Sequence, residues 1–184
     1  MVPGNWILPR RNFESPSLLT STVAAMRSYI DTSSGSRRTL RGYHQAPRRR
    51  AGPTASDNAV SPAFREMLSM LILSARLPSS NPSVEEVAVA SREMREEIIP
   101  LFRNVAPEIH GGGAYLNEAN VDFPEGEWQA AFYGEENYRR LWEIKQKWDP
   151  EHVFYATTAV GSEGWTVRGG VSGVKTQNGR LCRV

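Results

Sequence analysis

The amino-acid sequence predicts an α+β fold in which an antiparallel sheet is covered by helices on one face. A chain of 184 residues with 40% hydrophobic content is long enough to bury one core. Strand-like and helix-like apolar patterns alternate irregularly along it, which is typical of this architecture. No internal repeat is visible, and no apolar run approaches the ~20 residues of a membrane span. We therefore expect one compact unit.

Two elements are predicted in the first half of the chain. Ser15 followed by Pro16 indicates the start of a helix over 16–30, because serine caps helices and proline suits the first helical position. Its expected buried face consists of Leu18, Leu19, Val23, Met26 and Ile30. The run from Met67 to Ala75 favours a buried strand, although periodicity alone does not separate it from a helix. The earlier run from Trp6 to Arg10 is too short to classify.

The second half contains the clearer helices. Ser83 and Glu86 form a capping box, and the helix that it starts should end or kink near Ile99 because Pro100 lacks an amide donor. Gly111 to Gly113 precede a predicted strand, Ala114 to Ala119. Helices are predicted over Glu127 to Tyr133 and over Glu135 to Trp148, separated by Gly134 and stopped by Asp149-Pro150. The tail from Tyr155 is expected to be extended and packed on the body.

The charge distribution is uneven. The net charge is only +2, yet residues 37 to 50 hold six arginines and no acid. Segment 36–58 has no usable periodicity and is predicted to be a disordered or divergent insert. An arginine patch for nucleic acid or an anionic surface is the alternative, but clustered charge without a folded platform is more typical of a linker. We expect neither a nucleic-acid nor a membrane partner.

Several functional classes are excluded by residue counts. Cys182 is the single cysteine, so an internal disulfide and a cysteine-rich metal site are excluded. The three histidines, His44, His110 and His152, show no H-x-x-x-H spacing, and no metal site is expected. The first residues lack the basic-then-apolar order of a signal peptide. The chain is expected to be soluble, with its location unknown.

The motifs from residue 111 onward resemble the C-terminal segment of berberine-bridge-enzyme-like FAD-linked oxidases, and in particular their fungal members. The resemblance rests on G-G-G-A-Y-L-N-E-A at 111–119 and F-Y-G-x-x-N-Y-x-R-L-x-x-I-K-x-K-W-D-P-x-x-V-F at 132–154. Shorter matches are W-I-L-P-R-R at 6–11, N-A-V-S-P-A-F-R at 58–65, A-V-G-S-E-x-W at 159–165 and G-R-L-C-R-V at 179–184. The arginine-rich insert does not match, as a divergent loop or a wrongly translated intron or frame would explain.

The resemblance implies that the chain is an incomplete substrate domain of a vanillyl-alcohol-oxidase-type flavoenzyme. In this family an upstream domain binds FAD, often through a histidine and a cysteine, and a substrate domain covers the flavin. The sequence contains neither a glycine-rich FAD loop nor such an anchoring pair. Residues 1–35 would hold the first helix of the substrate domain and 59–110 its strand and long helix. Residues 111–184 would form the berberine-bridge-like segment.

The resemblance also implies candidate site residues. The family motif Y-x-N-Y corresponds to residues 115–118, so Glu118 replaces the second tyrosine, often the proposed base. Glu118 is the catalytic candidate, and a solvated glutamate at the end of a strand is the alternative. Tyr115 is a second candidate, lining the substrate pocket or packing in the core. Asn117 is a candidate for cofactor binding or for holding the following turn. On a strand, Tyr115 and Asn117 would share one face and Glu118 the other.

Two further cofactor candidates lie at the start of the second predicted helix of the pair. The family's matching asparagine approaches the flavin, and Asn137 lies where the positive end of a helix dipole suits the charge of reduced flavin. A local helix cap is the alternative. Tyr138 is the neighbouring candidate for cofactor binding. Together with Leu141, Trp142 and Trp148 it is more typical of core packing.

These features predict the C-terminal part of an FAD-dependent oxidoreductase. Such an enzyme takes a hydride from a C–H bond of a sugar, alcohol or secondary metabolite, through an upstream FAD-binding part that this chain lacks. The chain alone is expected to be inactive. The alternatives are a non-enzymatic fragment or interaction module without flavin, and an arginine-rich nucleic-acid binder.

Overall fold

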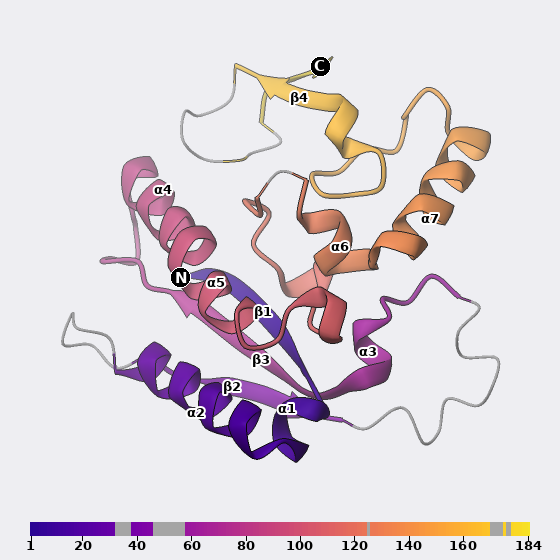
Figure 1. The fold of residues 1–184 in the computed structure, drawn as a ribbon. Coiled ribbons are helices and arrows are strands. Elements are labelled where there is room, and N and C mark those ends of the chain that lie inside the picture. The colour runs from indigo at the N-terminus through magenta and orange to yellow at the C-terminus, as the bar shows by residue number, and fades with distance from the viewer. Residues whose placement is uncertain (32–37, 46–57, 125, 170–174, 176–177) are drawn as a thin grey trace.

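A three-stranded antiparallel sheet forms the centre of the molecule, with helices packed on it and a small hairpin at the C-terminal end (Figure 1). The computed structural model describes residues 1–31, 38–45, 58–124, 126–169, 175 and 178–184. The strands are β1 (Val2–Pro9), β2 (Arg41–His44), β3 (Met67–Ala75), β4 (Trp165–Arg168) and β5 (Arg180–Arg183). The sheet order is β1-β3-β2, and β4 pairs with β5 alone. The predicted α+β class is confirmed.

The strand predicted at Met67 to Ala75 is confirmed as β3, the central strand. It pairs with β1 from Val2 to Pro9 and with β2 from Arg41 to His44, so both its edges are used. The unclassified run at Trp6 is part of β1. The two prolines of β1 suit an edge strand, because a residue without an amide hydrogen leaves no donor unpaired there.

Most helices in the first two thirds of the chain cover one face of the sheet (Figure 1). They are α1 (Arg11–Glu14), α2 (Pro16–Ile30), α4 (Val84–Glu93), the π-helical η3 (Met94–Ile98) and α5 (Ile99–Arg103). Alternation along β1 directs Trp6 and Leu8 into the main core beneath these helices, and Asn5 and Ile7 to the opposite face. The short helix α3 (Ala63–Glu66) instead packs with Ile7 in a smaller core cluster.

The bounds predicted for α2 are confirmed, and its predicted buried face is wrong in part, since Met26 and Ile30 do pack half-buried on the core. Leu19 and Val23 are exposed, whereas Thr22, Ala25 and Tyr29 are buried. Polar contacts set the rotation of α2 about its own axis, so that Thr22, Ala25 and Tyr29 face the core. Asn12 donates to the hydroxyl of Thr22, and the hydroxyl of Tyr29 exchanges hydrogen bonds with the backbone of Ser74. Apolar spacing alone does not contain this information.

The long helix begins and bends as predicted. Ser83 and Glu86 form both bonds of the capping box at the start of α4. A single π-helical stretch, Met94–Ile98, then joins α4 to α5. Pro100 follows it in the first turn of α5. Because proline cannot donate to the carbonyl four residues earlier, the backbone upstream accommodates it by widening the helix.

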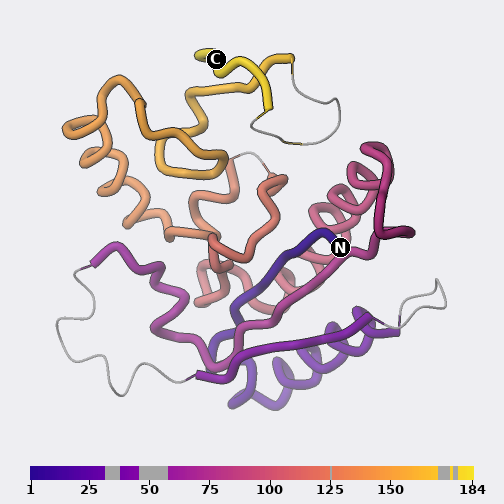
Figure 2. Tube along the Cα trace, turned by 180° about the vertical axis from the view of Figure 1, so that it is seen from behind, coloured from indigo at the N-terminus to yellow at the C-terminus, as the bar shows by residue number. Residues whose placement is uncertain are grey.

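The predicted helix pair near the C-terminus is confirmed as α6 (Trp128–Tyr133) and α7 (Glu135–Trp148). Gly134 separates them with a left-handed φ of 78°. The tail forms the short helix η6 (Ser162–Gly164) and the β4–β5 hairpin. Figure 2 shows this end of the chain on the opposite side of the molecule from α2. The predicted core position of Trp148 is wrong, since its side chain is 76% exposed.

Two other segments differ from prediction. Residues 114–119 are not a strand. Gly113 alone bridges β1, and Leu116–Glu118 forms the 3-10 turn η5, after the similar turn η4 (Glu108–His110). Within segment 36–58, Arg41–His44 forms β2, which a wholly disordered insert would not; residues 36–37 and 46–57 lie outside the described residues. Across the described part of the chain, no helix is long and apolar enough to cross a membrane.

The turn after α7 is held by Asp149, and this contact predicts a pH dependence. Asp149 accepts hydrogen bonds from the side chain of Lys145 and from the backbone amides of Val153 and Phe154. The bond from Lys145, followed by the two amide bonds, lowers the pKa of Asp149 below its ordinary value. A lowered pKa in the folded state stabilises the fold above the unfolded-state pKa, about 3.9, and this stabilisation is lost as pH falls through the folded-state pKa.

Asp149→Asn should therefore lower the Tm at neutral pH, and the difference from the original chain should vanish in acid. Thermal unfolding of both proteins over a pH series measures this. Glu143→Gln is the matched control, because Glu143 pairs with Arg139 on the exposed side of the same helix. A difference that persists unchanged below the folded-state pKa of Asp149 would contradict the assignment.

Candidate functional site

The loop that carries the motif residues is tied to the edge strand β1. Ile7 donates its amide to the carbonyl of Gly113 at 2.7 Å. The side chain of Asn5 then bonds both backbone groups of Tyr115, accepting from its amide at 2.6 Å and donating to its carbonyl at 2.8 Å. Asn5 is fully buried. This clamp of two hydrogen bonds fixes Tyr115 against β1.

Tyr115 and Asn117 lie together, as predicted, although on a turn and not on a strand. The amide of Asn117 donates to the hydroxyl of Tyr115 at 2.8 Å, and Asn117 is exposed. The ring of Tyr115 contacts that of Phe64 edge-on, with centroids 5.6 Å apart. Tyr115 therefore has a fixed ring and a hydroxyl with a local partner. These contacts leave both its core role and its pocket role possible as predictions.

Glu118 is half-buried at the end of η5, and one of its carboxylate oxygens is anomalous. Oε2 is shielded from solvent and has no hydrogen-bond partner among the described residues. A buried polar atom without a partner loses its bonds to water and gains none in return, which costs about 1–3 kcal/mol. The alternative of a solvated glutamate does not describe this oxygen. Among the described residues, one side-chain oxygen each of Ser69, Glu108 and Gln129 shares this state.

Asn137 lies in the first turn of α7, as predicted, and it is tied to the same neighbouring segment as Tyr115. Its side-chain amide donates to the carbonyl of Val60 at 3.0 Å, which leaves a second amide hydrogen for another acceptor. Four residues after Val60, Phe64 packs on Tyr115. Residues 60–64 therefore contact both candidates and bring the start of α7 to the same end of the sheet as η5.

Tyr138 makes contacts that favour the packing role. Its hydroxyl donates to the carboxylate of Glu163 at 2.6 Å and accepts from the amide of Gly161 at 3.1 Å. Its ring packs edge-on against Trp128. Burial, and next the hydrogen bond to Glu163, raise the pKa of Tyr138 above its ordinary value. The uncharged hydroxyl therefore links α7 to η6 through hydrogen bonds. Cofactor binding by Tyr138 stays a prediction.

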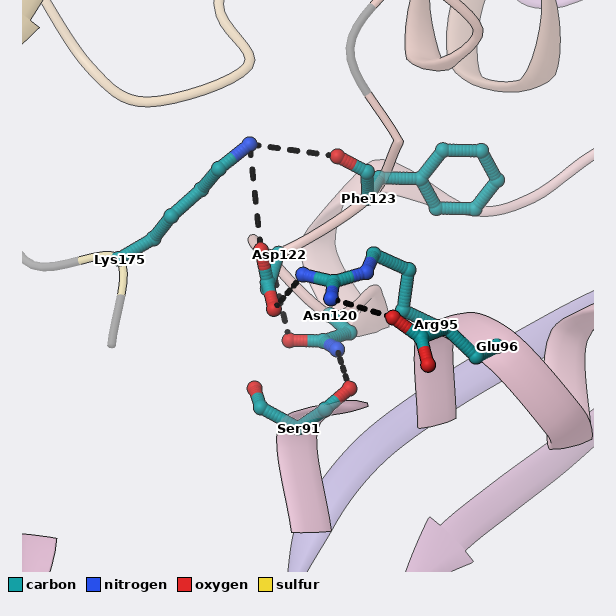
Figure 3. A network of polar contacts seen from close by, with 7 residues as sticks. All are labelled: Ser91, Arg95, Glu96, Asn120, Asp122, Phe123 and Lys175. Carbon is teal, nitrogen blue, oxygen red and sulfur yellow. Dashed lines mark hydrogen bonds and ion pairs between the residues drawn. The ribbon is translucent and has the colours of Figure 1, made fainter. Parts of the chain in front are cut away.

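A second polar cluster gathers around Asp122 (Figure 3). The buried carboxylate of Asp122 contacts Arg95 at 2.7 Å and Lys175 at 4.0 Å, and its backbone amide donates to Asn120. Arg95 also contacts Glu96. Two cations face two carboxylates, so the cluster is electrically balanced. We interpret it as a structural link between η3 and the C-terminal tail.

Hollows are present on the surface but do not coincide with the motif residues. One of about 330 Å³ adjoins Asp122, one of about 590 Å³ adjoins Arg103, and one of about 540 Å³ adjoins the start of α4. None of these three is lined by Tyr115, Glu118 or Asn137. In the described part of the chain, no group of three or more His, Cys, Asp or Glu side chains is placed to hold a metal ion.

Sequence reasoning missed the residues that position the candidates. Asn5 was passed over, although it is a single amide beside an apolar Trp-Ile-Leu run. Such a residue in a buried strand needs a partner and could have been flagged. Val60 and Phe64 carried no local signal, because their role comes from tertiary contacts with distant residues.

The fold and the motif region both match known flavoproteins. Residues 114–161 match the family model described as "Berberine and berberine like". The crystal structure of the VAO-type flavoprotein MtVAO615 from Myceliophthora thermophila C1 is 30% identical, with a TM-score of 0.76, over 99% of this chain and 30% of that one. The chain therefore has the fold of part of a VAO-type flavoprotein.

The relatives in sequence define the family more narrowly. An FAD-linked oxidoreductase from Neocamarosporium betae is 44% identical over 132 residues, covering 70% of this chain and 20% of the relative. The VAO-type flavoprotein oxidase VAO615 of Thermothelomyces thermophilus is 39% identical over 126 residues, covering 68% of this chain and 19% of the relative. The chain is similar to one part of the fungal berberine-bridge-enzyme-like FAD-linked oxidases and spans about a fifth of the length of these relatives.

Proposed function

We propose that the chain forms the substrate-covering part of an FAD-linked oxidase that oxidises a C–H bond of a sugar, alcohol or secondary metabolite. The unsatisfied Oε2 of Glu118 is the observation that carries this proposal. Buried carboxylate oxygens are usually paired with a donor. A substrate hydroxyl is the donor that this oxygen lacks, and accepting its proton is ordinary chemistry for a glutamate.

The roles follow from the side chains. FAD, when bound, accepts the hydride that leaves the substrate carbon. Glu118 takes the proton from the hydroxyl on that carbon, so the substrate loses two electrons and two hydrogens. Tyr115, held by Asn5, lines the substrate side of the site. Asn117, bonded to the hydroxyl of Tyr115, is a candidate for cofactor binding. Asn137 offers its second amide hydrogen, and the start of α7 a positive dipole end, to negative charge on the cofactor.

The residues present fit one side of a flavin and not its whole binding site. Glu118 offers an acceptor and Asn137 a donor, whereas the sequence holds no glycine-rich loop for the pyrophosphate. We therefore propose that the chain works only together with a flavin-binding part. The alternative is a non-enzymatic fragment or interaction module. The chain is mixed with the flavin-binding part and FAD and is then purified again. A chain that carries no flavin colour after this step would favour the alternative.

A chimera tests the role of Glu118. The matching stretch of the Neocamarosporium betae relative is replaced by this chain, and bleaching of the flavin absorbance by candidate alcohols and sugars is followed without oxygen. Glu118→Gln should slow bleaching at least about a hundredfold, the usual contribution of a general base. Glu97→Gln, an exposed glutamate on η3, is the control and should leave the rate unchanged. An unchanged rate in Glu118→Gln would remove Glu118 from the mechanism.

A further inference from the structure

Three aromatic rings meet where α6 is followed by α7. Trp128 lies 6.2 Å from Tyr133 and 5.4 Å from Tyr138 between ring centroids, and the two tyrosines are 5.7 Å apart. Trp128 is buried, and both tyrosines are half-buried. We call these three side chains the aromatic triangle. Rings in such close contact exchange electrons readily, so an electron lost by one of them is replaced by another.

The two tyrosines of the aromatic triangle differ in the group that accepts the phenol proton. The hydroxyl of Tyr138 lies 2.6 Å from each carboxylate oxygen of Glu163, to which it donates. The hydroxyl of Tyr133 donates to the backbone carbonyl of Thr158 at 3.1 Å. A carboxylate is a base that takes up a proton, whereas a backbone carbonyl only accepts a hydrogen bond. Tyr138 alone in the triangle therefore has a base in place.

A base at the hydroxyl changes the redox chemistry of a tyrosine. A phenol that loses an electron becomes a very strong acid, so the loss is much more favourable when a neighbouring base takes the proton at the same moment. Burial, followed by the hydrogen bond to Glu163, raises the pKa of Tyr138 and keeps its hydroxyl protonated at neutral pH. Tyr138 therefore loses its electron and its proton together, and Glu163 receives the proton.

From this geometry we propose that Tyr138 is a redox-active residue that takes oxidising equivalents from the buried Trp128 and passes them to solution. A free radical, acting as a one-electron oxidant, takes one electron from the indole of Trp128 and is itself reduced. Tyr138 gives one electron to the indole and its hydroxyl proton to Glu163, which leaves a neutral tyrosyl radical. A thiol or ascorbate in solution then supplies one electron, and the proton returns from Glu163, whose side chain is exposed. The indole in the core is thereby spared irreversible oxidation.

Photo-oxidation of the 184-residue chain tests this role without flavin or substrate. In oxygen-free solution a laser flash ionises the tryptophans, and a cobalt(III) ammine complex takes up the ejected electrons. A nitroso spin trap then marks tyrosyl radicals, and peptide mass spectrometry locates the adducts. We expect an adduct at Tyr138 in the original chain. Glu163→Gln keeps a hydrogen-bond acceptor but removes the base, so this adduct should fall severalfold. In Tyr138→Phe, oxidation products should accumulate on Trp128 instead.

Tyr133→Phe is the matched control, because it removes a hydroxyl from the same aromatic triangle and leaves the base in place. It should change neither the adduct at Tyr138 nor the oxidation of Trp128, whereas a general loosening of the packing would affect both tyrosine variants alike. The circular dichroism of each variant checks that it is folded. No adduct at Tyr138, an adduct there that Glu163→Gln leaves unchanged, or equal oxidation of Trp128 in the two tyrosine variants would overturn the proposal.

Discussion

Gly112→Ala should abolish stable folding of the chain. The added Cβ would lie 1.7 Å from the carbonyl oxygen of Ala106 and 2.7 Å from its carbon. Both are backbone atoms, and Gly112 is also bonded to the neighbouring Pro107 through its amide, so neither side can move without losing contacts. Overpacking of flexible side chains costs about 1–3 kcal/mol, and a clash between backbones should exceed the upper end of that range.

Urea unfolding and the yield of soluble protein measure this effect. Gly164→Ala is the matched control, since a Cβ there would meet no atom within 4 Å and the backbone is not left-handed. Its free energy of unfolding should stay within about 0.5 kcal/mol of the original chain. If Gly112→Ala behaved like Gly164→Ala, the close approach of the glycine loop to Ala106 would be wrong.

Trp6→Ala should be the most damaging change in the core, lowering the free energy of unfolding by about 3–5 kcal/mol. Trp6 is completely buried in β1, stacks on Phe123 with ring planes 3° apart, and donates its indole hydrogen to the carbonyl of Ala106 at 2.9 Å. Alanine removes the packing and leaves that carbonyl without this donor. Trp6→Phe keeps an aromatic ring but loses the indole donor and part of the buried volume, so its loss should be smaller than that of Trp6→Ala.

Trp148→Ala is the control for this experiment, because the same side chain is removed from an exposed position on α7. Its stability should stay within about 0.5 kcal/mol of the original chain. Equal losses for the two tryptophans would contradict the assignment of Trp6 to the core and Trp148 to the surface. Because Trp6 and Gly112 both contact Ala106, their effects on stability should not be additive.

Elements with strong local signals were predictable from the sequence. The capping box of Ser83, the stop at Asp149 and the break at Gly134 are each set by residues within a few positions, and α4, α6 and α7 begin or end there. The central strand β3 was predictable because it is buried on both faces and reads as one apolar run. Chain neighbours alone determine these features.

Features that depend on distant residues were not predictable. Residues 114–119 read as a strand, but the buried amide of Asn5 takes both backbone groups of Tyr115, and the chain turns immediately afterwards. Trp148 read as core because periodicity identifies an apolar side of a helix and not whether anything covers it. The resemblance pointed to Glu118, but its unsatisfied oxygen depends on the three-dimensional shielding of that one atom.

The contact of Tyr29 with Ser74 has a consequence for association between molecules. β2 ends its pairing with β3 at Ile72, so Ser74 would otherwise present an open amide and carbonyl to solvent. The hydroxyl of Tyr29 forms hydrogen bonds with both the amide and the carbonyl of Ser74. The edge strand β2 is only four residues long and begins with an arginine. A foreign strand therefore finds only a short edge that begins with a charged residue along this border of the sheet. Even as a small part of a larger architecture, the chain should resist amyloid-like stacking there.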